Sequence, residues 1–125
     1  MKIPESLNYT KDHEWVQIKD GIATVGVTDF AQSELGDIVF IEFPGKNEFF
    51  QKGDSMATIE AVKTVADLYA PISGKVIEFN HKLEENAEII NSDPFGKGWL
   101  VKLEISNSSE AKKLLTADEY ENLIQ

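Results

Sequence analysis

The sequence predicts a mainly β fold arranged as a single domain over residues 1–125. In several short runs apolar residues alternate with polar ones, which is the period-two pattern of strands that bury one face. Turn residues, such as Lys19-Asp20-Gly21, separate these runs. A chain of 125 residues is long enough for one hydrophobic core and too short for two comfortable domains.

Acidic residues outnumber basic ones by 22 to 12, which gives a formal net charge of -10. Nucleic acid is bound through clusters of Lys and Arg that release counterions, so we expect no nucleic-acid partner. An acidic surface steers association toward basic protein partners. It also keeps a protein soluble, and charge alone does not separate these two roles.

The chain contains no cysteine, no apolar run long enough to cross a bilayer, and no targeting leader at its start. We therefore expect a bacterial cytoplasmic protein with no membrane partner. The lack of cysteine excludes disulfides and thiolate metal sites, and it fits a reducing compartment. Any dithiol chemistry must then come from an attached cofactor.

The first expected element is a β-hairpin over residues 7–27. Its first strand runs from His13 to Ile18, and its second strand covers Ile22–Val27. The adjacent His13 and Glu14 raise the question of a metal site or an acid/base pair. The only other histidine is His81, so we expect no metal and interpret His13 as structural or partner-facing.

A short helix is expected next, capped by Thr28 or Asp29 and stopped by Gly36 after Leu35. Gln32 stands three residues after Asp29, as a capping-box partner would. The helix is expected to bury two apolar side chains, Phe30 and Leu35.

The strand that follows, Ile38–Phe43, is ended by Pro44-Gly45. Apolar residues stand on both of its faces. Strands of this kind are usually covered on both sides, so we expect this one to lie sandwiched inside the domain.

The second half of the chain supplies two further strands, Lys75–Phe79 and Trp99–Ile105. Between them, Asn80–Asn91 is polar and is expected to cross the surface as a loop and short helix. Asn91–Trp99 is a loop rich in turn residues. Its glycines lack the lysine and hydroxyl spacing of a P-loop, so we predict no phosphate site.

Thr116 and Glu119 form a capping box, which predicts a final helix that runs to about Ile124. Asn107-Ser108-Ser109-Glu110 opens this C-terminal helical region. Five of its side chains are expected to pack inward: Leu114, Leu115, Tyr120, Leu123 and Ile124.

The stretch Met56–Pro71 reverses direction around a lysine. Because a one-residue slip turns every side chain of a strand to the opposite face, an unbroken strand cannot move its apolar set from odd to even positions. A reversal within Val62–Val65 explains the switch and puts Lys63 at a hairpin tip, although no Gly, Asn or Pro marks a turn there. The switch is seen between Ala57, Ile59 and Ala61 on one side and Ala66, Leu68 and Ala70 on the other.

Three roles are open for a lysine at such a tip. From spacing alone the favoured role is solubility, because exposed turns commonly carry charge. A Schiff-base or general-base role is disfavoured, because it needs burial or a neighbouring cation, and Glu60 favours the charged ammonium. The third role is covalent modification, in which an acylating enzyme replaces the charge of Lys63 by a long flexible tether.

The residues around Lys63 resemble a known attachment site. Glu60-Ala61-Val62-Lys63, followed by Val65, by Asp67-Leu68-Tyr69-Ala70-Pro71 and by Gly74, is similar to the lipoyl-attachment hairpin of the glycine cleavage system H protein family. Biotin carriers share the hairpin but usually have Met on both sides of the lysine, and Val62 and Thr64 stand there in this chain. The resemblance covers roughly residues 7–125 and includes three further motifs in the same order: Tyr9–Trp15, Thr28–Asp37 and Asn91–Trp99.

The resemblance implies a lipoyl-domain-like barrel-sandwich hybrid of two small antiparallel sheets with short helices outside. It implies lipoic acid in amide linkage to Lys63, with Glu60 helping lipoate-attaching enzymes to recognise the site. The protein would be a carrier and not an enzyme. It would take the aminomethyl group of glycine from a pyridoxal-phosphate-dependent glycine decarboxylase to an aminomethyltransferase that uses tetrahydrofolate, and dihydrolipoamide dehydrogenase would then reoxidise it.

Two other functions stay open. One is a lipoyl carrier or relay that donates or holds lipoyl groups for another pathway, which a genomic neighbourhood without glycine decarboxylase would favour. The other is a non-catalytic binding module in which Lys63 is only a surface charge. An unmodified protein from a lipoate-competent host would favour that second alternative.

Overall fold

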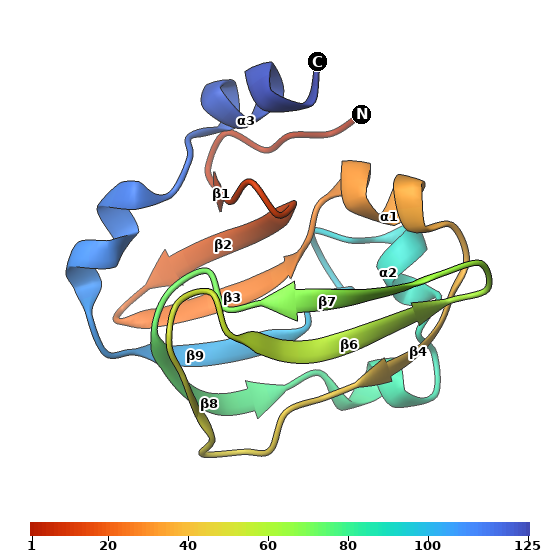
Figure 1. Ribbon diagram of the computed structural model, residues 1–125, viewed down its shortest axis with the longest axis horizontal. Helices are drawn as coiled ribbons and strands as arrows, with labels where there is room; N and C mark the ends of the chain where they lie inside the picture. The colour runs from red at the N-terminus through yellow and green to blue at the C-terminus, as the bar shows by residue number, and fades with distance from the viewer.

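The computed structural model describes residues 1–125 and contains two antiparallel sheets with the main core between them (Figure 1). The larger sheet has six strands in the order β1-β2-β3-β9-β8-β5, and the smaller has three in the order β4-β6-β7. The strands are β1 (Asn8–Tyr9), β2 (Glu14–Lys19), β3 (Ile22–Val27), β4 (Ile38–Glu42), β5 (Phe49–Phe50), β6 (Ser55–Ala61), β7 (Val65–Tyr69), β8 (Gly74–Phe79) and β9 (Val101–Ile105). The predicted mainly β architecture is confirmed.

The main core is formed by 22 buried residues that come from both sheets. Ile59 of β6 and Leu68 of β7 meet Val25, Val101 and Leu103 of the larger sheet, and all five are at most 1% exposed. Removing this apolar surface from water is the main favourable contribution that holds the two sheets face to face. No helix in the structure is both long and apolar enough to cross a membrane.

The hairpin β2–β3 is confirmed, with Lys19 paired to Ile22 across a two-residue loop. Asp20 and Gly21 in that loop have φ angles of +52° and +77°, which Asp tolerates better than most residues and Gly adopts freely. The prediction was wrong about His13, which lies in a turn before β2 with φ of +68°. Its N–H donates to the carbonyl of Thr10 at 3.2 Å within this turn, so the strand begins only at Glu14.

Helix α1 (Asp29–Leu35) is confirmed, and Thr28 caps it by accepting a bond from the N–H of Ala31 at 3.1 Å. Gln32 does not complete a capping box, because its side-chain amide donates to the Asp29 carboxylate instead, at 2.8 Å. No residue of this helix is fully buried. Phe30 and Leu35 were predicted to be buried, and both are only half-buried.

The prediction that β4 lies sandwiched inside the domain was wrong. This strand is an edge of the smaller sheet, paired only with β6, and it ends at Glu42. Its pairing shifts between Ile38 and Phe40, which is a β-bulge. Ile38 is therefore buried, while Val39 and Phe40 both remain exposed. The sequence is apolar at consecutive positions from Ile38 to Ile41, so its pattern gave no sign of the extra residue that the bulge inserts.

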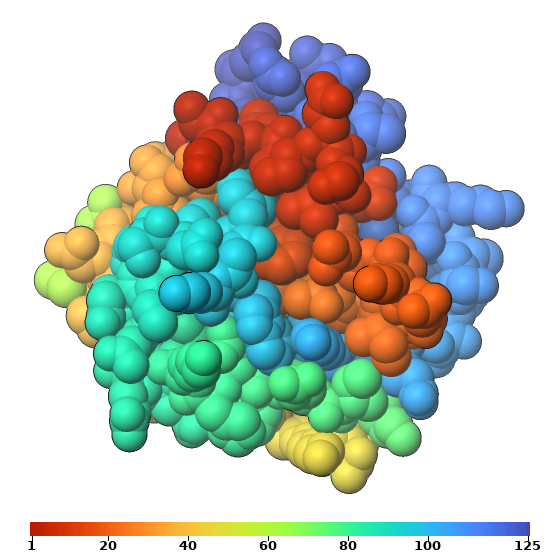
Figure 2. Space-filling model, turned by 180° about the vertical axis from the view of Figure 1, so that it is seen from behind, coloured from red at the N-terminus to blue at the C-terminus, as the bar shows by residue number.

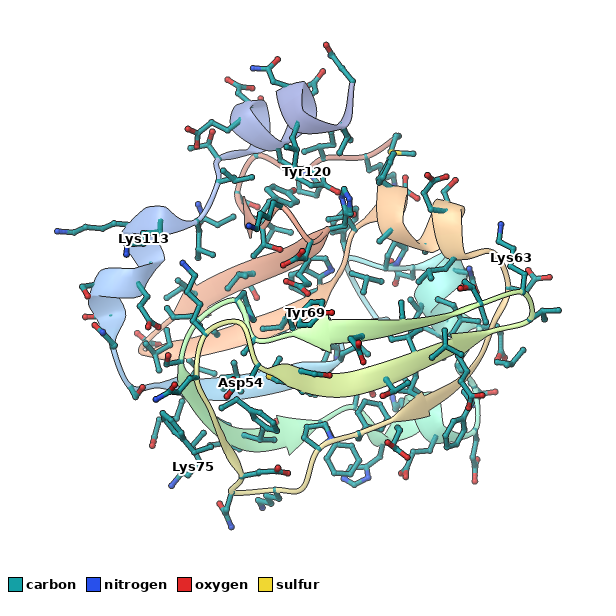
Figure 3. The ribbon with its side chains drawn as sticks, in the orientation of Figure 1. Asp54, Lys63, Tyr69, Lys75, Lys113 and Tyr120 are labelled. Atoms are coloured by element: carbon teal, nitrogen blue, oxygen red, sulfur yellow. The ribbon has the colours of Figure 1, made fainter.

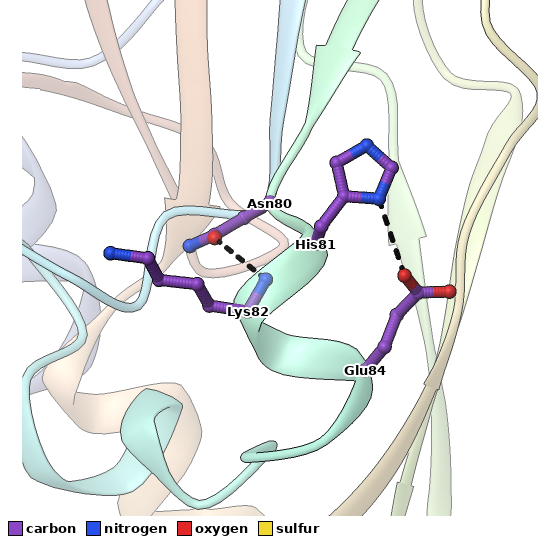
Figure 4. A network of polar contacts seen from close by, with 4 residues as sticks. All are labelled: Asn80, His81, Lys82 and Glu84. Atoms are coloured by element: carbon purple, nitrogen blue, oxygen red, sulfur yellow. Dashed lines mark hydrogen bonds and ion pairs between the residues drawn. The ribbon is translucent and has the colours of Figure 1, made fainter.

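The polar crossing after β8 is confirmed as the 3-10 helix η1 (His81–Glu84) and the short helix α2 (Ile89–Ser92). Asn80 caps the start of η1, with its side-chain oxygen accepting from the N–H of Lys82 at 3.3 Å (Figure 4). Its side-chain amide donates to the carbonyls of Lys97 and Trp99. Figure 4 also shows His81 beside Glu84, with the His81 Nδ1 atom 3.3 Å from the carboxylate. Because Asn80 ties down Trp99, β9 begins two residues later than predicted.

The C-terminal region contains the 3-10 helix η2 (Ser108–Lys113) and helix α3 (Ala117–Ile124), whose Thr116/Glu119 capping box is confirmed. Tyr120 is fully buried and stacks on Tyr9, with ring centroids 4.8 Å apart. Figure 2 shows from behind that the N-terminal residues and the C-terminal helix lie side by side. Leu114 is buried in the main core. Leu115 and Ile124 pack against a second, smaller cluster of five buried residues: Leu7, Tyr9, Trp15, Ala117 and Tyr120. Leu123 is 49% exposed, so its predicted inward packing is wrong.

Candidate functional site

Lys63 lies at the tip of the hairpin formed by β6 and β7, as the change in apolar pattern predicted. The last paired residues are Glu60 and Val65, and the N–H of Ala61 donates to the carbonyl of Thr64 at 2.8 Å. The Lys63 side chain is exposed at the end of the molecule, away from both termini (Figure 3). In the view from behind, the same tip projects at the left margin (Figure 2). Its position is confirmed, and its chemical role stays a prediction.

The hairpin tip is held by contacts from elsewhere in the chain. The N–H of Val62 donates to the carbonyl of Asp37 at 2.9 Å, so the tip is pinned to the segment that joins α1 to β4. Asn91 holds that segment in turn. Its side chain accepts from the N–H of Ile38 at 3.0 Å and donates to the carbonyl of Gly36 at 2.8 Å. These bonds position a reversal that has no conventional turn residue.

The Lys63 stem rests on the backbone of Gly36. A Cβ atom at that glycine would lie 3.3 Å from Cε of Lys63 and 3.7 Å from its Nζ. Gly36 also has φ of +77° and ψ of −154°, a conformation that is essentially restricted to glycine. The ammonium of Lys63 forms no ion pair with a carboxylate. The result is an amine with a supported stem and an open end.

Glu60 lies three residues before the lysine on the outer face of the smaller sheet, where it is exposed. Its cross-strand neighbours are Phe40 on β4 and Val65 on β7. Its carboxylate forms no ion pair, so no cation of this chain neutralises it. The structure thus presents a free acid between two apolar side chains, close to the amine in sequence and on the same hairpin.

A cavity of about 280 Å³ lies between α1 and the β6–β7 hairpin, beside the segment that carries Gly36. Its apolar walls come from both elements, with Phe30, Leu35 and Ala66 among them. Four carboxylic acids also line it: Asp12, Glu14, Glu34 and Asp67. Its only basic side chain is His13, and burial lowers the pKa of that imidazole, which favours the neutral form.

Glu14 is the buried acid of this cavity, with only 2% of its surface exposed. Burial raises the pKa of its carboxyl to about 7, although bonds from the Thr10 hydroxyl and the Tyr69 N–H, both 2.8 Å, favour the charged form. The bond to Tyr69 joins the first hairpin to β7. Nothing in the sequence pattern marks an acid at a strand start as buried, so Glu14 was considered only as a partner of His13 and its burial was not predicted.

The comparisons with known proteins agree with this geometry. Residues 7–125 match the family model described as glycine cleavage H-protein. The chain belongs to the glycine cleavage H-protein family. It is 49% identical over 124 residues to the glycine cleavage system H protein of Staphylococcus epidermidis, covering 99% of this chain and 98% of that one. It is 48% identical over 123 residues to the H protein of Carboxydothermus hydrogenoformans, covering 98% and 95%.

A solved structure of the family has the same fold. The crystal structure of a glycine cleavage system H protein from Mycobacterium marinum superposes with a TM-score of 0.86 at 38% identity, covering 96% of this chain and 97% of that one. The fold is therefore the lipoyl-domain-like barrel-sandwich hybrid that the resemblance implied. The H protein family works as the lipoyl carrier of the glycine cleavage system, and this chain shares that carrier role.

Proposed function

We propose that this protein performs its carrier role through lipoic acid bound in amide linkage to Lys63. The observation that carries the proposal is an exposed, unpaired amine at the tip of a hairpin that is bonded to Asp37, in the segment that Asn91 holds in place. Tethering a reacting group raises its effective concentration at each docked partner. A fixed starting point for the tether makes that gain reproducible from one partner to the next.

The residues beside the tip suit such a group. Gly36 leaves room for the lysine stem, and the chain has no cysteine, so a dithiol must come from outside. A lipoyl group held by Lys63 would supply a dithiolane, the chemistry that an acceptor of the aminomethyl group of glycine needs. The cavity between α1 and the hairpin offers apolar walls for the hydrocarbon part of the tether. Its acids offer complementary charge to a cationic amine cargo.

We further propose that Glu60 helps lipoate-attaching enzymes to recognise the site, and that the protein has no catalytic activity of its own. The functional partners are glycine decarboxylase, aminomethyltransferase and dihydrolipoamide dehydrogenase, because a carrier depends on enzymes that load, unload and reoxidise it. The bacterial relatives support a bacterial cytoplasmic location. The shared core supports one lipoyl-carrier domain over residues 1–125.

The experiment has two stages. The apo protein is incubated with a lipoate-attaching enzyme, lipoic acid and ATP, and its intact mass is measured. We expect one added lipoyl group, absent in Lys63→Arg and present in Lys19→Arg, which changes the lysine next to the loop of the first hairpin. The loaded protein is then mixed with glycine decarboxylase and assayed for exchange of bicarbonate into the carboxyl group of glycine. Modification that persists in Lys63→Arg, or a loaded protein without exchange, contradicts the proposal.

A further inference from the structure

A second cavity, of about 410 Å³, lies at the end of β7 that is far from the hairpin tip. Three segments surround it: the turn after β1, the turn before β6 and the end of η2. Figure 3 shows Lys113, on η2, at the side of the molecule opposite Lys63. A cavity of this size is within the range of sites that hold small molecules. We call it the lysine cavity.

Each of the three segments contributes one lysine to this cavity. The three are Lys11, Lys52 and Lys113, which are exposed, and none of their ammonium groups forms an ion pair. The cavity beside α1 has the opposite character, with four acids and no lysine. In a chain with a net charge of -10, the lysine cavity therefore gathers cations that are available to an anion.

The inner wall of the lysine cavity is apolar. Tyr9, Ala70, Pro71 and Leu114 are buried there, and Leu115 is half-buried. An inorganic anion would contact the lysines and leave this wall uncovered. A ligand with an apolar body would use both parts, which is how binding cavities commonly combine apolar walls with a few charged groups.

Two acids also line the lysine cavity, and both line the cavity beside α1 as well. Asp12 is exposed, and Glu14 is buried between the two cavities. Burial raises the pKa of the Glu14 carboxyl to about 7, so below that pH the carboxyl is neutral and does not repel an anion. Three lysines facing two acids leave a small positive excess, which suits a ligand with one negative charge.

We propose that the lysine cavity binds a small monocarboxylate with an apolar body. The ligand's carboxylate lies among the three ammonium groups, and its body lies against Leu114 and Leu115. Because Glu14 lines both cavities, a carboxylate that binds in one favours the neutral form of Glu14 and removes a negative charge from the other. The inference does not depend on what is attached to Lys63.

The pH dependence of binding follows from the groups around Glu14. On the side of the lysine cavity they are Lys11, Asp12, Lys52 and Lys113, and on the side of α1 they are His13, Glu34 and Asp67. The Tyr120 phenol also senses the charge of Glu14. As the pH rises through 7, Glu14 becomes ionised and repels a bound carboxylate, so the affinity should fall.

The test is an NMR titration of the unmodified full chain with octanoate, which follows the backbone amides of Gly53 and Leu115. These two residues line the cavity, whereas Gly21 in the first hairpin does not and should not shift. Acetate has the carboxylate without the body, and octanol has the body without the charge. Octanoate should bind about tenfold more tightly than either, because only octanoate uses both parts of the cavity.

A charge-removing variant tests the role of the lysines. In Lys52→Met/Lys113→Met the side chains keep an unbranched stem and lose their charge, so octanoate should bind about tenfold more weakly and octanol equally well. The control Lys19→Met/Lys97→Met removes two exposed lysines that lie outside the cavity, and it should bind octanoate as wild type does. Unchanged urea midpoints show that both variants remain folded.

The same titration at two pH values tests the role of Glu14. From pH 6 to pH 8, where octanoate stays ionised, wild type should lose about fivefold in affinity. Glu14→Gln stays neutral and should bind equally at both. Dependence that persists in Glu14→Gln would assign the effect to His13 and overturn the link to Glu14.

Three results would overturn the site itself. One is the absence of a saturable shift at Gly53 and Leu115 up to about 10 mM octanoate. Another is equal affinity for octanoate and octanol, which would leave the lysines without a role. The third is equal weakening in the two double-lysine variants, which would show that only net charge matters. None of these results bears on loading at Lys63.

Discussion

The hairpins β2–β3 and β6–β7 each carry a lysine next to the chain reversal, and they are built in different ways. In β2–β3, Asp20 and Gly21 adopt the left-handed conformations that a two-residue loop requires, and the strands pair without a shift. In β6–β7 the turn contains Val62, Lys63 and Thr64, and its geometry depends on bonds to the segment before β4. The first reversal is encoded locally, and the second is imposed by the tertiary structure.

The difference between the two turns has a functional consequence. A turn such as Asp20-Gly21 is shaped by its own residues and needs no contact from the rest of the molecule. A turn without glycine or proline can carry side chains chosen for other purposes, provided that other elements hold its backbone. Here those side chains are Lys63 and the apolar residues beside it. Substitutions in and around β2–β3 and β6–β7 should therefore have unequal effects, and the lysines should differ most.

Replacing the two hairpin lysines should give opposite results. Lys63→Arg should abolish lipoyl addition completely, because a guanidinium is not acylated by these enzymes, whereas Lys19→Arg should leave it intact. Intact mass after incubation with the attaching enzyme is the measurement. Equal loading of the two variants would mean that neither hairpin carries the site.

The bond that joins the two hairpins should make stability depend on pH. The Glu14 carboxyl has a pKa of about 7 in the folded chain, raised by burial from 4.5. Between pH 4.5 and 7 the Glu14 carboxyl is protonated in the folded chain and ionised in the unfolded chain. The stability that is fully present below pH 4.5 therefore decreases as the pH rises, and it is lost as the pH passes 7. The loss should reach about 3 kcal/mol relative to Glu14→Gln, which stays neutral.

Urea unfolding of wild type and Glu14→Gln at a series of pH values gives this difference directly. Other acids titrate in both proteins and cancel in the comparison. Glu121→Gln, an exposed position on α3, controls for the chemical change alone. Parallel stability curves for wild type and Glu14→Gln across the window would show that burial does not perturb this carboxyl.

Removing the Asn91 side chain should loosen only the second hairpin. Asn91→Ala leaves the N–H of Ile38 and the carbonyl of Gly36 without their partners, which should cost about 2 kcal/mol. Hydrogen exchange at the Val62 amide should accelerate, while exchange in β2–β3 stays slow. Asn107→Ala, which removes the exposed cap of η2, is the control. Equal acceleration in both hairpins would indicate general destabilisation instead.

Two glycines with φ of +77° should respond differently to alanine. At Gly21 a Cβ meets nothing within 4 Å, so Gly21→Ala should cost only the backbone strain of about 1 kcal/mol and leave loading of Lys63 unchanged. At Gly36 a Cβ would press on the lysine stem, so Gly36→Ala should also slow loading. Urea midpoints and initial loading rates check both. Normal loading of Gly36→Ala would show that the stem does not need this support.

Much of the fold could be predicted because its signals are local. Alternation gave the strands on either side of Lys63, and turn residues gave the first hairpin. The Thr116/Glu119 capping box gave the final helix. The errors fall where a contact from a distant segment decides. A bulge in β4 exposed Phe40, a turn with Thr10 took His13 out of its strand, and the helix surface left Leu123 in solvent.

For the site, the sequence alone was enough to place Lys63 at the reversal, because side chains alternate with a period of two along a strand and a change of parity needs a turn. It also carried the motifs that identify the family. The surroundings of that amine could be seen only in the folded chain: Gly36 against the lysine stem, the Asn91 bonds to Gly36 and Ile38, the buried Glu14, and the exposed apolar side chains near the tip. These depend on segments far apart in the chain, and their proximity is fixed by the packing of two sheets rather than by any local pattern.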